Sequence, residues 1–234
     1  MLSIRDLHVR FGQAHILQGI SLEIGAAPLA IVGRNGMGKT TLCQAIMGLV
    51  STSQGEIKLG GESLIGQPPF RIARRGVALV PQGRRTFPSL TVDEHLRLVS
   101  QGRDARWNIA RIYETFPRLA ERRRNGGTEL SGGEQQMLAI SRALLMNPKL
   151  VIMDEPSEGL APVIVDHLIG VLRALKQDGM SLLLVEQNLR VATEVAEQVA
   201  IMVTGRIAAE MPAATLAGDA EIQRRYLGVS AGGH

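Results

Sequence analysis

Continuous apolar runs and amphipathic segments take turns along this chain. Residues 28–32, 150–154 and 180–186 are apolar at most positions, whereas a strand with one face in water would alternate. Uninterrupted apolar strands with helices between them are typical of a parallel sheet that is covered on both faces. The other segments with strand character are residues 2–9, 20–24, 56–59, 199–203 and 206–210. The pattern therefore predicts an α/β fold.

The first helix is predicted directly after a glycine-rich turn. It begins near Gly38 and ends near Gly48. Farther along the chain, helical spacing dominates from about residue 91 to 146. Thr91 and Glu94 open this stretch with the S/T-x-x-E pattern of a capping box. We therefore expect a helical region inserted between two groups of strands.

Another amphipathic helix is predicted within residues 160–179. Gly179 is placed to end it, because glycine readily adopts the left-handed conformation that often follows a helix. The apolar positions recur at helical spacing: Leu160, Ile164, Leu168, Leu172 and Leu175. A helix of this length between two apolar strands fits the crossover connection that a parallel sheet requires.

Composition places the chain among ordinary globular proteins. Its 234 residues suffice for one large domain or two small ones. Hydrophobic residues make up 45% and charged residues 21%, which excludes a disordered or fibrous protein. Aromatic residues are only 3%, which argues against a surface built for stacking on single-stranded nucleic acid. The net charge of +4 permits contact with nucleic acid or anionic membranes without requiring it.

Neither secretion nor a membrane span is expected. The one cysteine, Cys43, cannot form an internal disulfide and has the apolar neighbours of a buried thiol, which fits a reducing cytosolic setting. No stretch of about 18 apolar residues occurs, and the N-terminal residues 1–12 carry charge throughout. The densest basic run, residues 118–125, is typical of a solvated helix end.

The segment "GRNGMGKT", residues 33–40, matches the G-x-x-x-x-G-K-[ST] phosphate loop between an apolar strand and a helix. Its glycines let successive N–H groups and the positive end of the helix dipole converge on phosphate oxygens. Lys39 adds a cation for the β- and γ-phosphates, and Thr40 offers a hydroxyl to Mg²⁺. The predicted nucleotide-binding residues here are Gly33, Arg34, Asn35, Gly36, Met37, Gly38, Lys39, Thr40 and Thr41.

Two adjacent carboxylates, Asp154 and Glu155, end the apolar run 150–154. Such a pair is most often a polar turn, but together with a phosphate loop it predicts two different roles. Asp154 would ligate Mg²⁺ directly or through water, because this ion prefers hard oxygen ligands. Glu155 would orient or deprotonate the water that attacks the γ-phosphate. The sequence therefore predicts a bound nucleotide together with Mg²⁺.

Between these sites lies "LSGGEQQ", residues 130–136, and with it nearly the whole chain resembles the ATP-binding-cassette (ABC) transporter ATPases. The resemblance implies a RecA-like P-loop NTPase core with a mostly parallel sheet, an N-terminal antiparallel β part and an inserted helical subdomain. It also implies that two such subunits pair head to tail. The signature residues of one subunit would then close over the ATP that Lys39 of the other subunit holds: Ser131, Gly132, Gly133 and Glu134.

The resemblance carries three further roles onto single positions. Gln82 matches the glutamine that joins the Mg²⁺ site to the helical subdomain and to the membrane partner. Phe11 matches the aromatic residue that stacks on adenine, although a single aromatic in a strand can also pack in the core. Ser157 matches the start of the loop that passes between the two subunits.

Two positions depart from the wider family. A histidine that contacts the γ-phosphate is replaced by Gln187, and the five histidines lie elsewhere: His8, His15, His95, His167 and His234. Glutamine can donate a hydrogen bond to phosphate but cannot relay a proton, which favours Glu155 as the group that handles water. The inter-subunit loop reads "SEGLAP", where many relatives carry an aspartate after the serine.

These departures resemble one branch of the family. "MDEPSEGLAP", "LLLVEQN", "VPQGRRTFPSLTV" and the late "YLG" are similar to the smaller ATPase of branched-chain amino acid importers and of related importers for urea or amides. The resemblance implies permease subunits, a second ABC ATPase that is identical or different, and indirectly a solute-binding protein. It implies a peripheral place on the cytoplasmic face of the bacterial inner membrane. We expect residues 1–82 and 148–234 to form the ATP-binding core and residues 83–147 the helical subdomain.

Other functions remain as alternatives. A soluble ABC ATPase that acts on nucleic acid or the ribosome fits the positive net charge. However, chromosome-maintenance relatives insert long heptad arms, of which the chain shows no sign, and ribosome-acting relatives carry two cassettes in one chain. A kinase or switch GTPase would leave the "LSGGE" segment without a role. We therefore expect no nucleic-acid partner, and the transported solute cannot be read from this chain.

Overall fold

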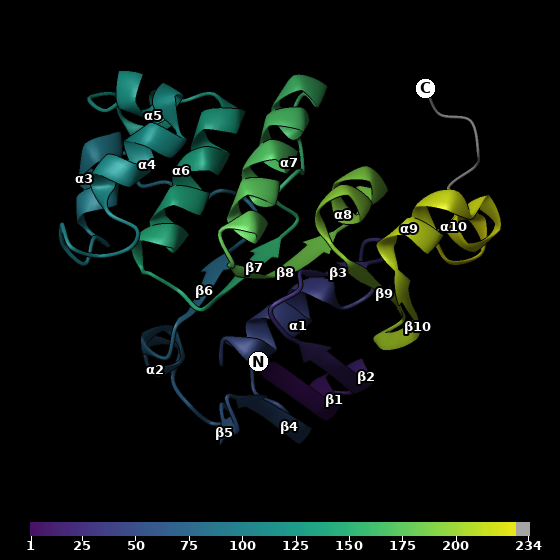
Figure 1. The fold of residues 1–234 in the computed structure, drawn as a ribbon. Coiled ribbons are helices and arrows are strands. Elements are labelled where there is room, and N and C mark those ends of the chain that lie inside the picture. The colour runs from purple at the N-terminus through teal and green to yellow at the C-terminus, as the bar shows by residue number, and fades with distance from the viewer. Residues whose placement is uncertain (228–234) are drawn as a thin grey trace.

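A six-stranded, mostly parallel sheet runs through the centre of the molecule (Figure 1). The computed structural model describes residues 1–227. In sheet order the strands are β10 (Arg206–Pro212), β9 (Gln198–Val203), β3 (Leu29–Val32), β8 (Ser181–Glu186), β7 (Leu150–Asp154) and β6 (Val77–Val80). Neighbouring strands from β9 to β6 pair in parallel, and β10 pairs antiparallel with β9. The predicted α/β class is confirmed.

The central strands are buried on both faces, as their lack of alternation predicts. On β7, Val151 and Met153 lie in one hydrophobic core with α6, α7 and α8. Leu150 and Ile152 lie in a second core with α1 and the antiparallel strands. These helices are α1 (Lys39–Ile46), α6 (Gly132–Leu145), α7 (Pro162–Gln177) and α8 (Leu189–Val195). Figure 1 shows α6, α7 and α8 on one side of the sheet, and α1 with the N-terminal strands on the other.

A four-stranded antiparallel sheet covers part of the second face. Its order is β2 (Ala14–Ile24), β1 (Leu2–Phe11), β4 (Gln54–Leu59) and β5 (Glu62–Ser63), and α2 (Pro69–Arg74) follows it in the chain. Inward residues of β1 such as Ile4, Leu7 and Val9 are fully buried in the second core. Because this sheet has only one buried face, its strands keep the partial alternation that the apolar central strands lack.

The inserted helical region lies at one end of the molecule, in teal in Figure 1. It holds α3 (Val92–Arg97), α4 (Ile109–Thr115), α5 (Pro117–Glu121), the 3₁₀ helix Gly127–Glu129 and α6. The predicted capping box opens α3: the Thr91 side chain accepts a hydrogen bond from the Glu94 amide, and Glu94 Oε2 accepts one from the Thr91 amide at 2.8 Å. The cap thus satisfies helix donors that would otherwise lack partners.

The predicted helix within residues 160–179 begins later than its apolar spacing indicates. Pro162 is the first residue of α7, so Leu160 lies in the preceding loop and is not a helical position. Proline is favoured at this position because it lacks the N–H that would be unpaired there anyway. Gly179 has a φ of 76° and follows the helix end, as expected.

Several short elements are absent from the sequence prediction. Among the helices they are α2, α8 and the C-terminal helices α9 (Ala213–Gly218) and α10 (Ala220–Leu227). Six to eight residues span about two helical turns, which is too short for a 3.6-residue period to emerge. Strand β2 likewise begins at Ala14, before the predicted segment. Gly228, which ends the "YLG" segment, and His234 lie outside the described residues.

Two further expectations concern burial and membranes. Cys43 is buried in the second core, as predicted for a lone thiol with apolar neighbours, and burial raises its pKa. Among residues 1–227, no helix has the length and apolarity that crossing a membrane requires.

Candidate active site

The glycine-rich loop between β3 and α1 is tightly packed against the rest of the sheet. A side chain at Gly33 would begin with a Cβ only 2.5 Å from the carbonyl oxygen of Met202, so this position has no room for one. Gly38 caps the start of α1 with a φ of 99°, a left-handed conformation that glycine adopts at little cost. The loop also accepts a hydrogen bond at the carbonyl of Met37 from the Gly205 amide. Residues far apart in the sequence therefore hold the loop in shape.

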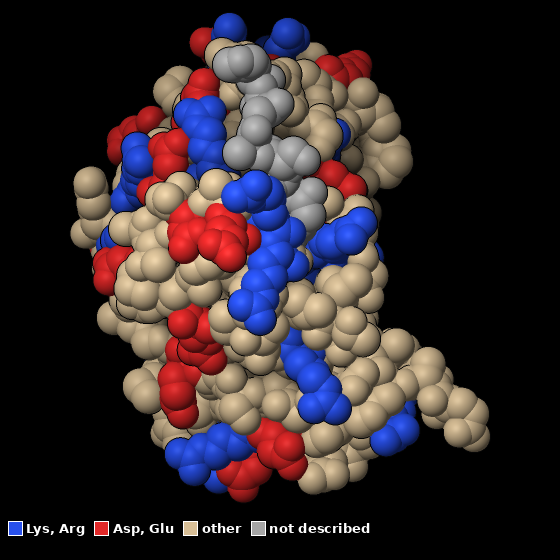
Figure 2. Space-filling view, turned by 90° about the vertical axis from the view of Figure 1, so that its right-hand side faces the viewer, with Lys and Arg blue, Asp and Glu red and all other residues tan. Residues whose placement is uncertain are grey.

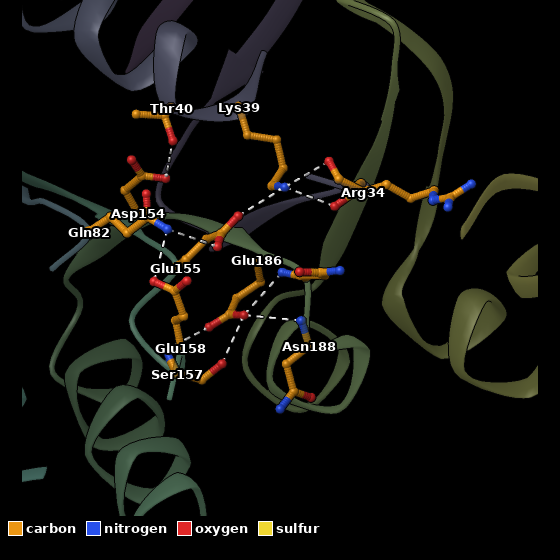
Figure 3. Close-up of polar contacts among 12 residues, drawn as sticks. Arg34, Lys39, Thr40, Gln82, Asp154, Glu155, Ser157, Glu158, Glu186 and Asn188 are labelled. Carbon is orange, nitrogen blue, oxygen red and sulfur yellow. Dashed lines mark hydrogen bonds and ion pairs between the residues drawn. The ribbon is translucent and has the colours of Figure 1, made fainter. Parts of the chain in front are cut away.

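Lys39 is the first residue of α1, directly after this loop, and is only 3% exposed. Its Nζ donates hydrogen bonds to the carbonyl oxygens of Gly33 and Arg34, at 2.9 and 3.1 Å. The same atom forms an ion pair with Glu155 Oε1 at 3.0 Å (Figure 3). The ammonium group is thus fixed where loop carbonyls and one acidic side chain converge.

The two acids at the end of β7 point to different partners. Asp154 Oδ1 accepts a hydrogen bond from Thr40 Oγ1 at 3.3 Å, whereas Glu155 faces Lys39 (Figure 3). Glu155 has a φ of 49°, and its amide donates to the carbonyl of Val185 on β8. The chain therefore turns sharply after Asp154, which sends successive side chains to separate places.

Thr40 and Asp154 fit one side of a Mg²⁺ site. Both present hard oxygen atoms next to the phosphate loop. Burial raises the pKa of Asp154, and the hydrogen bond from Thr40 opposes that rise. No group of three or more His, Cys, Asp or Glu side chains suited to a metal occurs within residues 1–227. A site of few protein oxygens is what Mg²⁺ uses when substrate phosphates and water complete its coordination.

Gln82 follows β6 and does not join the pair of Thr40 and Asp154 through any hydrogen bond that the structure shows. Its Nε2 donates instead to Glu158 Oε2 at 2.8 Å and to Glu155 Oε2 at 3.5 Å (Figure 3). Arg84 Nη2 also donates to the Glu158 carbonyl at 3.1 Å. The segment after β6 is therefore bound to the loop that follows the acidic pair.

Gln187 directly follows Glu186, the last residue of β8, and β8 pairs with β7. Its amide donates to Glu186 Oε2 at 3.2 Å, and Glu186 also accepts from Ser157 (Figure 3). Burial raises the pKa of Glu186, and the hydrogen bonds from Ser157 and from the Asn188 amide oppose that rise. The contact joins the predicted start of the inter-subunit loop to the predicted phosphate-contacting position.

The signature segment caps α6 and lies apart from the phosphate loop. The Ser131 side chain accepts a hydrogen bond from the Glu134 amide, and Glu134 Oε2 accepts one from the Ser131 amide at 2.8 Å. A Cβ at Gly133 would lie 2.7 Å from Ile164 of α7, so glycine permits close packing of the two helices. Within residues 1–227, no hydrogen bond or ion pair joins Ser131 or Glu134 to residues 33–41.

A protein-family model described as ABC transporter matches residues 17–158. This chain belongs to the ABC transporter family. It is 37% identical to the high-affinity branched-chain amino acid transport ATP-binding protein BraG of Pseudomonas aeruginosa, over 97% of this chain and 100% of BraG. It is 34% identical to a probable branched-chain amino acid transport ATP-binding protein, LivF of Archaeoglobus fulgidus, over 89% and 90% of the two chains. It is 31% identical to the lipopolysaccharide export system ATP-binding protein LptB of Haemophilus influenzae, over 97% of each.

Similarity to solved structures agrees with this membership. An ATP-binding subunit of an ABC transporter superposes with a TM-score of 0.80 and 26% sequence identity, over 99% of this chain and 95% of that one. The P-loop NTPase fold that the family resemblance implies is therefore confirmed. The chain is an ATPase of this family, whose members bind adenine nucleotides, dimerise and work with permease subunits.

In this ABC ATPase, Phe11 lies at the end of β1 and is 50% exposed. The alternative that it packs in the hydrophobic core is therefore wrong.

Three residues of the site had no sequence prediction: Glu158, Glu186 and Arg84. Glu158 stands in the departing "SEGLAP" segment, and Glu186 adjoins the departing Gln187, so each neighboured a visible signal. Nothing in the sequence pattern singles out Arg84.

Proposed function

We propose that this chain is the ATPase subunit that powers import of branched-chain amino acids or of related small polar solutes such as urea or amides. Its similarity to BraG over the full length of both chains carries the solute assignment. Identity to LptB is lower, which favours import over lipopolysaccharide export. The site around Lys39, Thr40, Asp154 and Glu155 supports hydrolysis as the source of energy.

ATP binding exchanges the contacts of Lys39 in this proposal. The ammonium group leaves the loop carbonyls and Glu155 for the β- and γ-phosphates, while the N–H groups of residues 33–41 bind phosphate oxygens. Thr40 and Asp154 would hold Mg²⁺, and Gln82 would add a ligand once its amide turned from Glu158. The ion neutralises charge on the phosphates.

Glu155, released from Lys39, orients and deprotonates the attacking water. A carboxylate next to the γ-phosphate is suited to this, because it accepts a proton and has a hydrogen-bond acceptor to spare. Gln187 donates a hydrogen bond to a γ-phosphate oxygen and cannot relay a proton. The proton of the attacking water therefore goes to Glu155.

The signature residues act in trans. Ser131 caps α6, a helix of 14 residues, and the segment Ser131–Glu134 makes no hydrogen bond to the phosphate loop of its own chain among the described residues. The N-terminus of α6 closes instead over ATP held by a second ABC ATPase, identical or different. Residues 83–147 form the helical subdomain. The permease docks on this subdomain near Gln82, where Phe87 is 49% exposed. Residues 1–82 and 148–234 form the ATP-binding core. The assembly is peripheral, on the cytoplasmic face of the inner membrane.

Action on nucleic acid receives little support from the charges. On the face that Figure 2 displays, Lys and Arg side chains run down the middle, and Asp and Glu side chains adjoin them on the left and at the bottom. Strong binding to a nucleic-acid backbone requires a basic stripe or patch, because affinity comes from neutralised phosphates. Stimulation of ATPase activity by DNA or RNA, with a steep dependence on salt, would favour this alternative instead.

Transport itself provides the test. The chain is reconstituted in liposomes with the permease subunits, any second ATPase and the solute-binding protein encoded beside it. We expect uptake of radiolabelled leucine that requires internal ATP and that the Glu155→Gln variant abolishes. Urea serves as the second solute, and a matched preparation with internal ADP serves as the control. Full ATPase activity without uptake of either solute would contradict the proposed solute class.

Phe11→Ala is expected to weaken ATP and GTP binding alike. Stacking of an aromatic ring on a base contributes about 1–3 kcal/mol, so the dissociation constants should rise about 5- to 150-fold. Stacking without contacts to the base edge discriminates poorly between purines. The ratio of the dissociation constants for ATP and GTP should therefore stay close to one. Fluorescence titration with labelled ATP and GTP measures both values. Unchanged affinity in this variant would contradict the stacking role.

A further inference from the structure

Glu186 is a buried carboxylate without a cationic partner among the described residues. It ends strand β8 and is 1% exposed. None of the ion pairs among residues 1–227 involves it. A charge in the interior is costly unless other groups solvate it. Its surroundings must therefore supply that solvation.

Neutral donors from two loops surround this carboxylate. Ser157 donates its amide to Oε1 at 3.1 Å and its hydroxyl to Oε2 at 2.9 Å. Oε2 also accepts the amides of Gln187 and Asn188, at 3.2 and 3.1 Å (Figure 3). Four hydrogen bonds thus converge on one side chain and join the loop after β7 to the loop after β8.

Both loops carry residues that the proposed function places at the γ-phosphate. Ser157 follows Glu155 by two positions, and the Glu155 amide is itself bonded to the Val185 carbonyl on β8. Gln187 is held by its main chain to Glu186. The positions of Glu155 and Gln187 relative to each other therefore depend on contacts made across the ends of β7 and β8.

We propose that Glu186 is a positioning residue for ATP hydrolysis, which holds Ser157 and the main chain of Gln187 at a fixed separation so that Glu155 and Gln187 address the same γ-phosphate. The inference rests on the function proposed above. Glu186 touches neither substrate nor metal in this role. It acts through the two loops, and through Ser157 it also ties the hydrolytic site to the loop that enters the subunit interface.

Physical chemistry explains why a carboxylate suits this place. Only a group with several lone pairs on two oxygens accepts four donors from separate directions, and an ionised carboxylate has no proton of its own to place. A glutamine has one acceptor oxygen. If that oxygen takes the place of Oε2, the amide NH₂ faces the Ser157 amide and separates it from the strand end.

Two variants test the link. Glu186→Gln and Ser157→Ala each weaken the Ser157 side of the contact, and each is expected to lower kcat about 10- to 100-fold, because small misplacements of reacting groups have effects of that size. KM for ATP should change less than about twofold, since the phosphate loop is untouched. The double variant should lose little more than either single one, because both changes break the same link.

Matched controls separate positioning from general loss of stability. Ser141→Ala removes a serine hydroxyl that is also buried but has no hydrogen-bond partner within residues 1–227. Glu194→Gln removes a carboxylate on the neighbouring helix α8 that pairs with Arg173 and Arg190. Both controls should keep kcat within about twofold of the wild type, the scale of ordinary surface or neutral changes. Thermal unfolding of all variants identifies any that fold poorly.

The outcomes distinguish this inference from the function on which it rests. If Glu155→Gln abolishes turnover while Glu186→Gln and Ser157→Ala match their controls, the positioning role is wrong and the hydrolytic site stands. A rise in KM without a fall in kcat would also overturn the positioning role. If Glu155→Gln retains full turnover, the proposed site itself fails.

Discussion

Glu155→Gln is expected to lower kcat for ATP hydrolysis by about 10²- to 10⁴-fold, the range that a general base contributes. The amide keeps the size of the side chain but cannot take a proton from water. ATP binding should persist, because Glu155 pairs with Lys39 and its neutralisation removes a competitor of the phosphates for that cation. Phosphate release and equilibrium binding of labelled ATP measure the two quantities on one preparation.

A surface carboxylate provides the control for this variant. Glu197→Gln removes an exposed carboxylate that pairs with Lys176, and it should leave both turnover and ATP binding unchanged. Full hydrolysis by Glu155→Gln would show that another group handles the water. Loss of ATP binding together with hydrolysis would show that Glu155 holds the loop in shape, and its role as a base would then be without support.

Features encoded by a few consecutive residues were predictable from the sequence. The phosphate loop, its helix and the capping box at Thr91 depend on local backbone geometry, and the structure has them at the expected positions. The apolar run ending at Asp154 marked a central strand because both faces of that strand are buried. Such features need no knowledge of which distant segment lies opposite.

Contacts between distant segments were not predictable in the same way. Glu186 and Ser157 are separated by 28 intervening residues, and only the parallel pairing of β7 with β8 brings them together. Gln82 and Glu158 meet for the same reason, through the pairing of β6 with β7. Burial of an acidic residue runs against the pattern that sequence analysis uses, so Glu186 reads as the polar end of a strand.

Lys39→Met is expected to weaken ATP binding by at least about 100-fold, because a charge-assisted contact to two phosphates is lost from a buried site. The same change leaves Glu155 without its cation at a nearly buried position. Breaking a buried ion pair by removing one partner destabilises a protein by about 3 kcal/mol or more. Lys39→Met should therefore unfold at a lower temperature than the wild type even without nucleotide.

The double variant Lys39→Met with Glu155→Gln separates these two effects. Replacing Glu155 by glutamine removes the unpaired charge, so most of the lost stability should return while ATP affinity stays low. Thermal unfolding, followed with and without ATP and Mg²⁺, reports both, since a ligand that binds the folded state raises its unfolding temperature. If the double variant regained ATP binding, Lys39 would serve mainly to neutralise Glu155. If it stayed as unstable as Lys39→Met, the hydrogen bonds from Lys39 to the carbonyls of Gly33 and Arg34 would be the stabilising contacts.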